Sequence, residues 1–145
     1  MARIIAVCTS EKKGQRKKNV KQGMLVVERG LEGDAHAGPW HRQVSLLAME
    51  SIRKMQDMGL DVHAGDFAEN ITTQGVDLLS LAIGTRIRLG EHAVLEITQH
   101  GEECHAPCAI YHQAGTCVMP KEGIFARVLE GGRVKVGDDI TVIEG

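Results

Sequence analysis

The sequence predicts a mostly β fold, a closed or nearly closed β-barrel of short, mainly antiparallel strands with two or three inserted helices. Short apolar or alternating runs, about seven of them, recur at close spacing along the chain. Glycine-rich and polar stretches separate these runs, as expected for turns between strands. The regular alternation of strands with helices that a doubly wound parallel sheet requires is missing. We therefore expect a single domain that spans residues 1–145.

The bulk composition argues against several classes of protein. Apolar residues make up 43% and charged residues 25% of the chain, which is ordinary for a soluble globular protein. The net charge of -2 and the 3% of aromatic residues favour neither a basic nucleic-acid surface nor stacking platforms for bases. No apolar run approaches the ~20 residues of a membrane helix, and the run from Ile4 to Cys8 is too short for a signal peptide. We expect a cytoplasmic protein with reduced thiols and no membrane or nucleic-acid partner.

Three strands are expected early in the chain, over residues 3–8, 24–28 and 43–48, because each is an apolar or β-branched run. The loop before the second strand is basic, which is typical either of a solvated loop or of a loop that catches an anion beside a site. The loop after it is rich in glycine, aspartate and histidine, and long loops in compact domains are often functional. The charged and polar candidates in these two loops are Lys17, Lys18, Asp34, His36, His41 and Arg42.

Further elements follow in order. A helix is expected from Ala48 to Met58, with one apolar stripe (Met49, Ile52, Met55) and Gly59 as its terminator. Residues 61–84 are interpreted as mostly turns between short strands, and residues 85–89 and 93–98 as an antiparallel pair. Another helix is expected over residues 120–129, because Pro120 suits a first helical position and the apolar residues that follow share a face. Strands over residues 133–136 and 140–143 close the chain.

Reactive side chains are concentrated between His100 and Pro120, which include three of the four cysteines. One hypothesis is a Cys3His zinc site made of Cys104, Cys108, His112 and Cys117. Against it, Pro107 is best placed at the start of a helix, which leaves Cys104 in the preceding loop, and the chain lacks a CxxC knuckle. The other hypothesis is a nucleophilic Cys104 next to His105, because a helix N-terminus stabilises a thiolate. The residue pattern leaves both open.

Several motifs resemble those of the MOSC domain proteins, which are related to the C-terminal domain of molybdenum cofactor sulfurase. The matching segments are GLEGDAHAG with RQVSLL at 42–47, GDFAENITT at 65–73, LLSLAIGTRIRLG at 78–90, LEITQ at 95–99, the cysteine at 104, MPKEGIFARVL and GGRVKVGD. The likeness runs almost from end to end. The chain departs from the family pattern at Ala68, where a glycine usually precedes the Glu-Asn pair.

The resemblance implies a MOSC-type β-barrel and a role as a sulfur carrier or a molybdenum-cofactor-binding protein. In that role, Cys104 accepts sulfane sulfur from a pyridoxal-phosphate cysteine desulfurase and delivers it to a metal–sulfur centre or to the cofactor, molybdopterin. The implied partners are that desulfurase and proteins of molybdenum-cofactor biosynthesis, since this chain shows no pyridoxal-phosphate lysine motif of its own. Whether the chain turns over as a sulfurtransferase is left open, as is the choice between monomer and homodimer.

The expected site residues fall into three groups. Cys104 is the sulfur carrier, and His105 lowers its pKa or relays a proton. Cys108 and Cys117 join Cys104 as candidate metal ligands. The cofactor-binding candidates are Lys17, Lys18, Asp34, His36 and Arg42, which include the cations for the phosphate, and Asn70, Thr72 and Thr73 for a pterin edge. The alternative from another class is a zinc-stabilised module that binds a partner protein and performs no chemistry, and a third reading is a molybdoenzyme with an electron-transfer partner.

Overall fold

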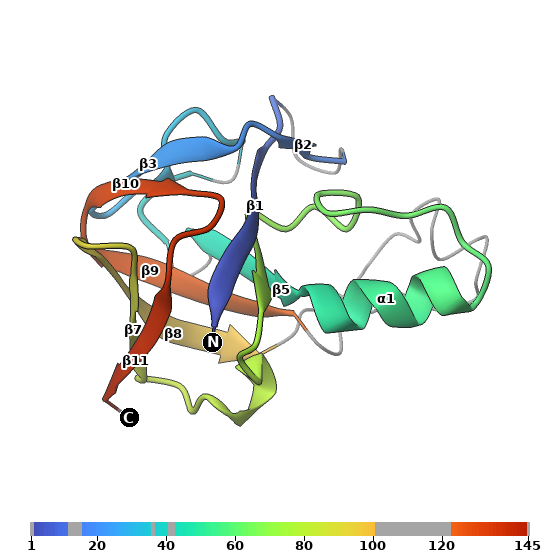
Figure 1. Cartoon of the computed structure of the whole chain (residues 1–145). Helices are drawn as coiled ribbons and strands as arrows, with labels where there is room; N and C mark the ends of the chain where they lie inside the picture. The colour runs from blue at the N-terminus through green and yellow to red at the C-terminus, as the bar shows by residue number, and fades with distance from the viewer. Residues whose placement is uncertain (1, 12–15, 36, 41–42, 101–122, 145) are drawn as a thin grey trace.

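The computed structural model describes residues 2–11, 16–35, 37–40, 43–100 and 123–144, and within them it is mostly strand (Figure 1). The elements, in chain order, are β1 (Arg3–Thr9), β2 (Lys18–Asn19), β3 (Gln22–Val26), β4 (Gly30–Leu31), β5 (Val44–Ala48), α1 (Met49–Asp57), β6 (Ile71–Gln74), a single 3₁₀ turn (Leu78–Ser80), β7 (Arg86–Leu89), β8 (Ala93–His100), β9 (Ile124–Glu130), β10 (Gly132–Lys135) and β11 (Ile140–Glu144). The mostly β, mainly antiparallel fold that the sequence predicts is confirmed.

The strands form two sheets. The larger has the order β11-β7-β8-β9-β5-β6-β1-β2, and the smaller has the order β10-β3-β4. The larger sheet curls until its two sides meet, because Arg3 of β1 forms an antiparallel bridge with Asp139, just before β11. The amide of Ile140 donates to the Ala2 carbonyl at 3.0 Å, and the amide of Ile4 donates to the Asp138 carbonyl at 2.9 Å. The sheet therefore nearly closes on itself.

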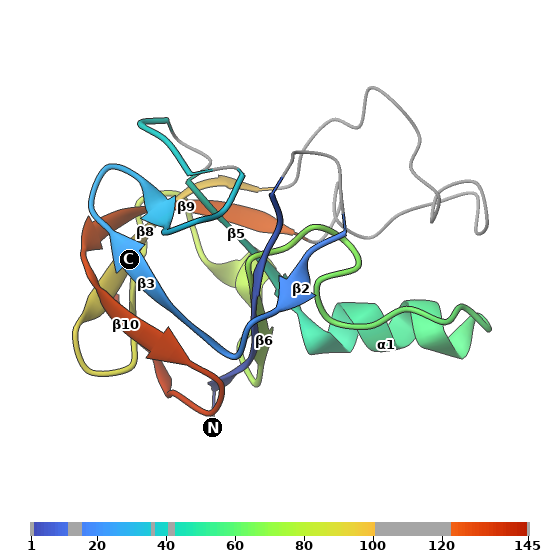
Figure 2. The ribbon, with the colours of Figure 1, turned by 90° about the horizontal axis from the view of Figure 1, so that it is seen from above.

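Alternation along the strands divides the apolar residues between an inner and an outer layer. The inner cluster fills the curl of the sheet and includes Ile4, Leu46, Ile71, Leu95 and Ile124, all fully buried. The outer cluster lies between the sheet and α1 and includes Leu47 of β5, Ile52 and Met55 of α1, and Phe125 of β9. Figure 2, a view from above, shows α1 projecting to one side of the strands.

The helix expected from Ala48 to Met58 is confirmed as α1, with Ile52 and Met55 buried and Met49 partly buried against the sheet. It connects β5 to β6, which pair in parallel through Leu46 with Ile71 and Ala48 with Thr73. One β-α-β crossover is therefore present in a chain whose sequence shows no such rhythm. A single unit of this kind is too little to give the repeated alternation of a doubly wound sheet.

The helix expected over residues 120–129 is wrong. Residues 124–130 form strand β9, which pairs with β8 on one side and β5 on the other. Ile124, Phe125 and Ala126 are all buried, because the strand has the inner cluster on one face and the outer cluster on the other. A run that is buried on both faces is continuously apolar, and its pattern cannot be told from that of a short helix. In the described residues, helical structure is limited to α1 and the 3₁₀ turn.

The two-residue strands β2 and β4 lie in segments that were expected to be loops, whereas the other elements agree with the sequence to within a few residues. The antiparallel pair of β7 and β8 is confirmed, with Ile87 opposite Leu95, and so are the two closing strands. The second strand begins earlier than expected, at Gln22, and ends at Val26, because Glu28 adopts a left-handed conformation (φ 65°) that starts a turn. Among the described residues, no helix has the length and apolar composition needed to cross a membrane.

Candidate functional site

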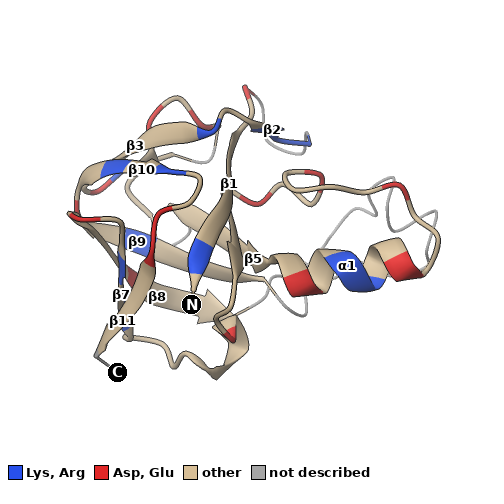
Figure 3. Cartoon of the chain, viewed as in Figure 1, with Lys and Arg blue, Asp and Glu red and all other residues tan. Residues whose placement is uncertain are grey.

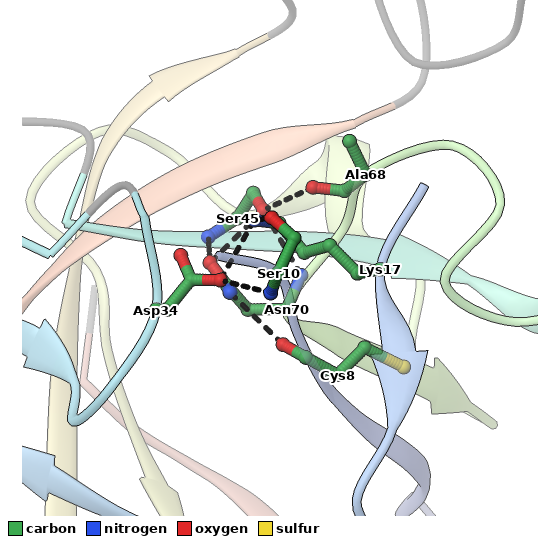
Figure 4. Close-up of polar contacts among 7 residues, drawn as sticks. All are labelled: Cys8, Ser10, Lys17, Asp34, Ser45, Ala68 and Asn70. Carbon is green, nitrogen blue, oxygen red and sulfur yellow. Dashed lines mark hydrogen bonds and ion pairs between the residues drawn. The ribbon is translucent and has the colours of Figure 1, made fainter. Parts of the chain in front are cut away.

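Three loops meet where β1 ends. The amide of Ala35 donates to the carbonyl of Ser10 at 2.9 Å, and the amide of Lys17 donates to the carbonyl of Gly65 at 2.7 Å. The amide of Cys8 donates to the carbonyl of Asn70 at 2.6 Å. Segments that are far apart in the sequence are thus tied together by backbone hydrogen bonds. We call the polar side chains gathered here, with the strained Ala68, the buried polar cluster: Cys8, Ser10, Lys17, Asp34, Ser45, Ala68, Glu69, Asn70 and Thr72 (most are drawn in Figure 4).

The strongest interaction in the cluster is an ion pair between Lys17 and Asp34, whose side chains are both 0% exposed. The Lys17 Nζ lies 2.7 Å from Asp34 Oδ1 and also donates to Ser10 Oγ at 3.0 Å. The backbone amide of Ser10 donates to the same Asp34 oxygen at 3.0 Å. A buried ion pair is tolerated only when further hydrogen bonds compensate the loss of water, as these do. The pair locks the 29–40 loop to the end of β1.

The side-chain amide of Asn70 joins three strands at the start of β6. Its Nδ2 donates to the carbonyl of Cys8 at 3.1 Å, and its Oδ1 accepts from the backbone amide of Ser45 at 3.0 Å. The Ser45 hydroxyl lies 3.2 Å from the same Oδ1 and 3.3 Å from the carbonyl of Ala68. Asn70 is completely buried, so its amide is committed to holding β1, β5 and the 65–70 turn together.

Glu69 is the least expected member of the cluster, because its carboxyl group is 0% exposed. The Thr72 hydroxyl donates to its Oε2 at 2.8 Å, whereas Oε1 has no hydrogen-bond partner within the described part of the chain. Burial raises the pKa of this carboxyl group, and the nearby backbone amide of Gly65 and the Thr72 hydroxyl oppose the rise. The fold therefore favours the uncharged form of Glu69.

Ala68 is held in a left-handed conformation, with φ at 65°. This gives a physical reason for the glycine that usually stands here in the family pattern: a glycine adopts this conformation without steric cost, whereas an alanine adopts it under strain. The strain lies directly before Glu69 and Asn70. Both side chains therefore depend on a backbone turn that alanine does not favour.

Replacing Ala68 with glycine is expected to stabilise the protein by about 1 kcal/mol, because it removes the left-handed strain. Chemical denaturation of the two proteins measures the difference. Ala64→Gly, at a position without positive φ in the same loop, is the matched control and is expected to be neutral or destabilising. A glycine at 68 that destabilises as much as the control would contradict the strain interpretation.

Cys8 shows that a thiol in this cluster need not be reactive. Its side chain is buried, and burial together with the carboxylates of Glu69, Asp66 and Asp34 raises the pKa of the thiol to about 12, against a smaller lowering by Lys17. Thiolates rather than thiols are nucleophiles, so Cys8 is chemically quiet at neutral pH. This agrees with its place in an apolar strand.

Comparison with known proteins identifies the family. The family model described as MOSC domain matches residues 33–141 of this chain, most of its length. The chain belongs to the MOSC domain family. The match includes the GDFAENITT segment that builds the 65–70 turn and β6, and it includes the position of Cys104. No curated protein matches the sequence.

Solved structures agree with this family at the level of the fold. The YuaD protein from Bacillus subtilis superposes with a TM-score of 0.78 at 20% identity, over 97% of this chain and 94% of that protein. YiiM from Geobacillus stearothermophilus gives a TM-score of 0.72 at 16% identity, over 99% of this chain and 76% of YiiM. YiiM from Escherichia coli gives a TM-score of 0.68 at 20% identity, over 99% of this chain and 70% of that protein. At these identities the likeness shows the MOSC fold alone.

The expected cofactor-binding residues divide into exposed and buried ones. Lys18 is exposed on β2, opposite Thr9. Lys17 and Asp34 are brought together, but their charges bind each other in the interior. Asn70, Thr72 and Thr73 are all 0% exposed, with Asn70 and Thr72 bonded to protein groups and Thr73 Oγ1 without a partner in the described residues. His36, Arg42, Cys104, His105, Cys108, His112 and Cys117, and the helix expected to begin at Pro107, lie outside the described residues.

Several members of the cluster are absent from the sequence-based list of site residues. Ser10, Ser45 and Glu69 gave no signal of their own, because a lone serine or glutamate is common on any surface. The signal that was present is Ala68 in the GDFAENITT segment, since a position that favours glycine indicates an unusual turn. Within the described residues, no group of three or more histidine, cysteine, aspartate or glutamate side chains is placed to bind a metal.

The cluster lies apart from two grooves of the described surface. One groove, of about 520 Å³, runs beside α1 and is lined by residues such as Lys54, Val76 and Leu79. The other, of about 430 Å³, is lined by residues such as Trp40, Glu96 and Arg127. No member of the cluster lines either groove. The hydrogen bonds and the ion pair of the cluster therefore serve to hold the described loops together.

Proposed function

We propose that this MOSC protein is a sulfur carrier that accepts sulfane sulfur on Cys104 and delivers it to a metal–sulfur centre or to the molybdenum cofactor. The observation that carries the proposal is the MOSC match over residues 33–141, in a family associated with proteins like molybdenum cofactor sulfurase. In this proposal the partners are a pyridoxal-phosphate cysteine desulfurase, which donates the sulfur, and proteins of molybdenum-cofactor biosynthesis. Cys104 follows β8, and Cys8, the one cysteine in the described residues, has the inert surroundings of a buried thiol.

The transfer step conserves atoms and electrons. The Cys104 thiolate attacks the outer sulfur of the desulfurase persulfide, a new S–S bond forms on Cys104, and the desulfurase cysteine leaves as a thiolate. Delivery to an acceptor thiolate repeats the step, with Cys104 as the leaving thiolate. Delivery to a metal as sulfide would also consume two electrons, which two thiols of a reductant would supply as they are oxidised to a disulfide. His105 takes the proton of the Cys104 thiol before attack, because an imidazole titrates near neutral pH.

Part of the described surface fits an anionic cofactor such as molybdopterin. Exposed cations suit its phosphate, and two of them are the sequence neighbours of the buried Lys17. These are Lys18 on β2 and Arg16, whose guanidinium lies 3.5 Å from Asp66. Figure 3 shows that basic residues are interspersed with acidic ones over the rest of that view. Asn70 and Thr72 are committed to protein partners, so in this proposal they support the site from within. When bound, the cofactor supplies the molybdenum that receives the sulfur.

Replacing Cys104 with alanine is expected to abolish persulfide formation when the protein is incubated with a cysteine desulfurase and cysteine. Mass spectrometry of each cysteine measures the added sulfur. Cys8→Ala is the matched control and is expected to accept sulfur as the parent does, because the buried Cys8 thiol stays protonated.

Sulfur acceptance that persists without Cys104, on Cys108 or Cys117, would overturn the site assignment. The zinc-module alternative has its own outcome: one tightly held zinc ion per chain, lost when Cys108, His112 or Cys117 is replaced, with no sulfur acceptance by the parent. Metal analysis of the protein as purified distinguishes the two results.

A further inference from the structure

A polar oxygen without a partner inside the buried polar cluster needs a role. Glu69 Oε1 is fully buried and has no hydrogen-bond partner in the described residues, whereas Oε2 accepts from Thr72 at 2.8 Å. Such a group costs free energy, and it is held there at the further cost of a left-handed alanine immediately before it. Strain and desolvation that coincide at adjacent residues indicate a position under functional constraint.

The 65–70 turn that carries Glu69 connects three parts of the site. The carbonyl of Gly65 accepts a hydrogen bond from the backbone amide of Lys17, the lysine of the buried ion pair. Asn70 binds Ser45 and the carbonyl of Cys8. Phe67 belongs to the same apolar cluster as Phe125 of β9, the strand that follows residues 101–122. A shift of this turn would therefore move the ion pair, the start of β6 and the support of β9 together.

We propose that Glu69 supports the 65–70 turn in a proton-dependent way, with its protonated carboxyl group bound to Thr72 at Oε2 and no cation needed to balance it. Among the described residues, an ionised carboxylate in the same volume would have no unpaired cation to face, since the buried ammonium of Lys17 already binds Asp34 at 2.7 Å. The other charged or titratable groups beside the turn are the Cys8 thiol of β1, the Asp66 carboxylate of the turn itself and the Arg16 guanidinium, which forms an ion pair with Asp66 at 3.5 Å. This inference rests on the proposed function for its activity readout only.

The sign of the pH dependence follows from which form the fold favours. Burial raises the pKa of Glu69 above its ordinary value of 4.5, so the native turn binds a proton that the open turn releases. The stabilisation of the native turn is complete at pH values below the ordinary pKa of 4.5, and it is lost as the pH rises through the raised pKa of the folded state. Measurements up to about pH 8.5 exclude a contribution from titration of the Cys8 thiol, because its pKa is raised from 9.0 to about 12.

The test compares Glu69→Gln and Glu69→Ala with the parent by amide hydrogen exchange of peptides that cover residues 65–73. Rates are corrected for intrinsic exchange between about pH 5 and about pH 8.5. The parent is expected to lose protection as the pH rises, by at most tenfold for each pH unit between the ordinary and the raised pKa of Glu69. Glu69→Gln, an uncharged isostere, is expected to keep its protection across this range.

In Glu69→Ala the 65–70 turn is expected to be unprotected at every pH, because alanine cannot bind Thr72. Glu50→Gln, at an exposed acid of α1, is the control and should keep the slope of the parent.

A Glu69→Gln protein with the same pH slope as the parent would overturn the inference, and so would full protection in Glu69→Ala. The activity readout is the rate of persulfide formation on Cys104, expected to fall severalfold in Glu69→Ala and to be rescued by Glu69→Gln. If Glu69 had a purely structural role that did not involve its proton, Glu69→Ala would lower the rate of persulfide formation, but the parent and Glu69→Gln would show the same pH dependence of exchange protection. If Cys104 accepts no sulfur in the parent, the proposed function fails, whereas the exchange results still decide the role of Glu69.

Discussion

Replacing Gly65 with alanine is expected to destabilise the protein by about 3 kcal/mol or more, enough to unfold much of a marginally stable domain. Gly65 has a φ of 92°, and a Cβ atom at this position would overlap the carbonyl oxygen of Lys17 and lie 3.1 Å from Cys8 Sγ. The Lys17 oxygen belongs to backbone that is itself hydrogen-bonded to Gly65, so it cannot move away without opening the cluster. Urea denaturation, followed by circular dichroism, measures the loss.

Gly59→Ala is the matched control for this prediction. Gly59 has nearly the same φ, 89°, but a Cβ atom there would meet no atom within 4 Å. Its replacement is expected to cost only the left-handed strain of an alanine, roughly 1 kcal/mol. The difference between the two variants isolates the close approach of the 65–70 turn to Lys17. Equal losses in both variants would show that the turn tolerates displacement.

Replacing Asp34 with alanine is expected to cost about 3–5 kcal/mol, because it leaves the ammonium of Lys17 buried without its counter-charge. Lys17 Nζ would keep the Ser10 hydroxyl at 3.0 Å, a partner that does not neutralise it. Urea denaturation measures the loss.

The double variant Lys17→Met with Asp34→Leu separates the role of the charge from the role of the shape. Removing both members of a buried ion pair in favour of apolar groups of similar size is often neutral. We therefore expect the double variant to recover most of the stability that Asp34→Ala loses. A double variant as unstable as the single one would mean that the hydrogen bonds to Ser10, and not the paired charges, hold the loops together.

Patterns of local origin were predicted well. The stripe of Met49, Ile52 and Met55 gave α1, and the alternation in TRIRL gave β7, because each pattern reports a single face of one element. The segment around Phe125 was assigned to the wrong class. It lies between two strands and two apolar clusters, and nothing in its own residues distinguishes burial on both faces from the face of a helix.

The candidate site shows the same division. Lys17 and Asp34 were named as separate binding residues, since the sequence gives no sign that residues 17 positions apart share an ion pair. Asn70 was expected to face a pterin, but its amide joins β1, β5 and β6, whose register is a long-range property. Glu69 was overlooked because burial of a carboxyl group depends on what covers it.

By itself, the sequence determined the mostly β class and the position of α1, because these depend on residue types at short, fixed spacing. Its motifs also carried the resemblance to the MOSC family, and that resemblance implies Cys104 as the proposed sulfur carrier. Tertiary structure alone decided that β9 is a strand, that Lys17 and Asp34 form a buried ion pair, and that Glu69 is buried with no hydrogen-bond partner for Oε1 among the described residues. The physical reason is that pairing, burial and charge compensation join residues from distant segments. Each such contact, and the free energy that it contributes, forms only when the whole fold brings its partners together.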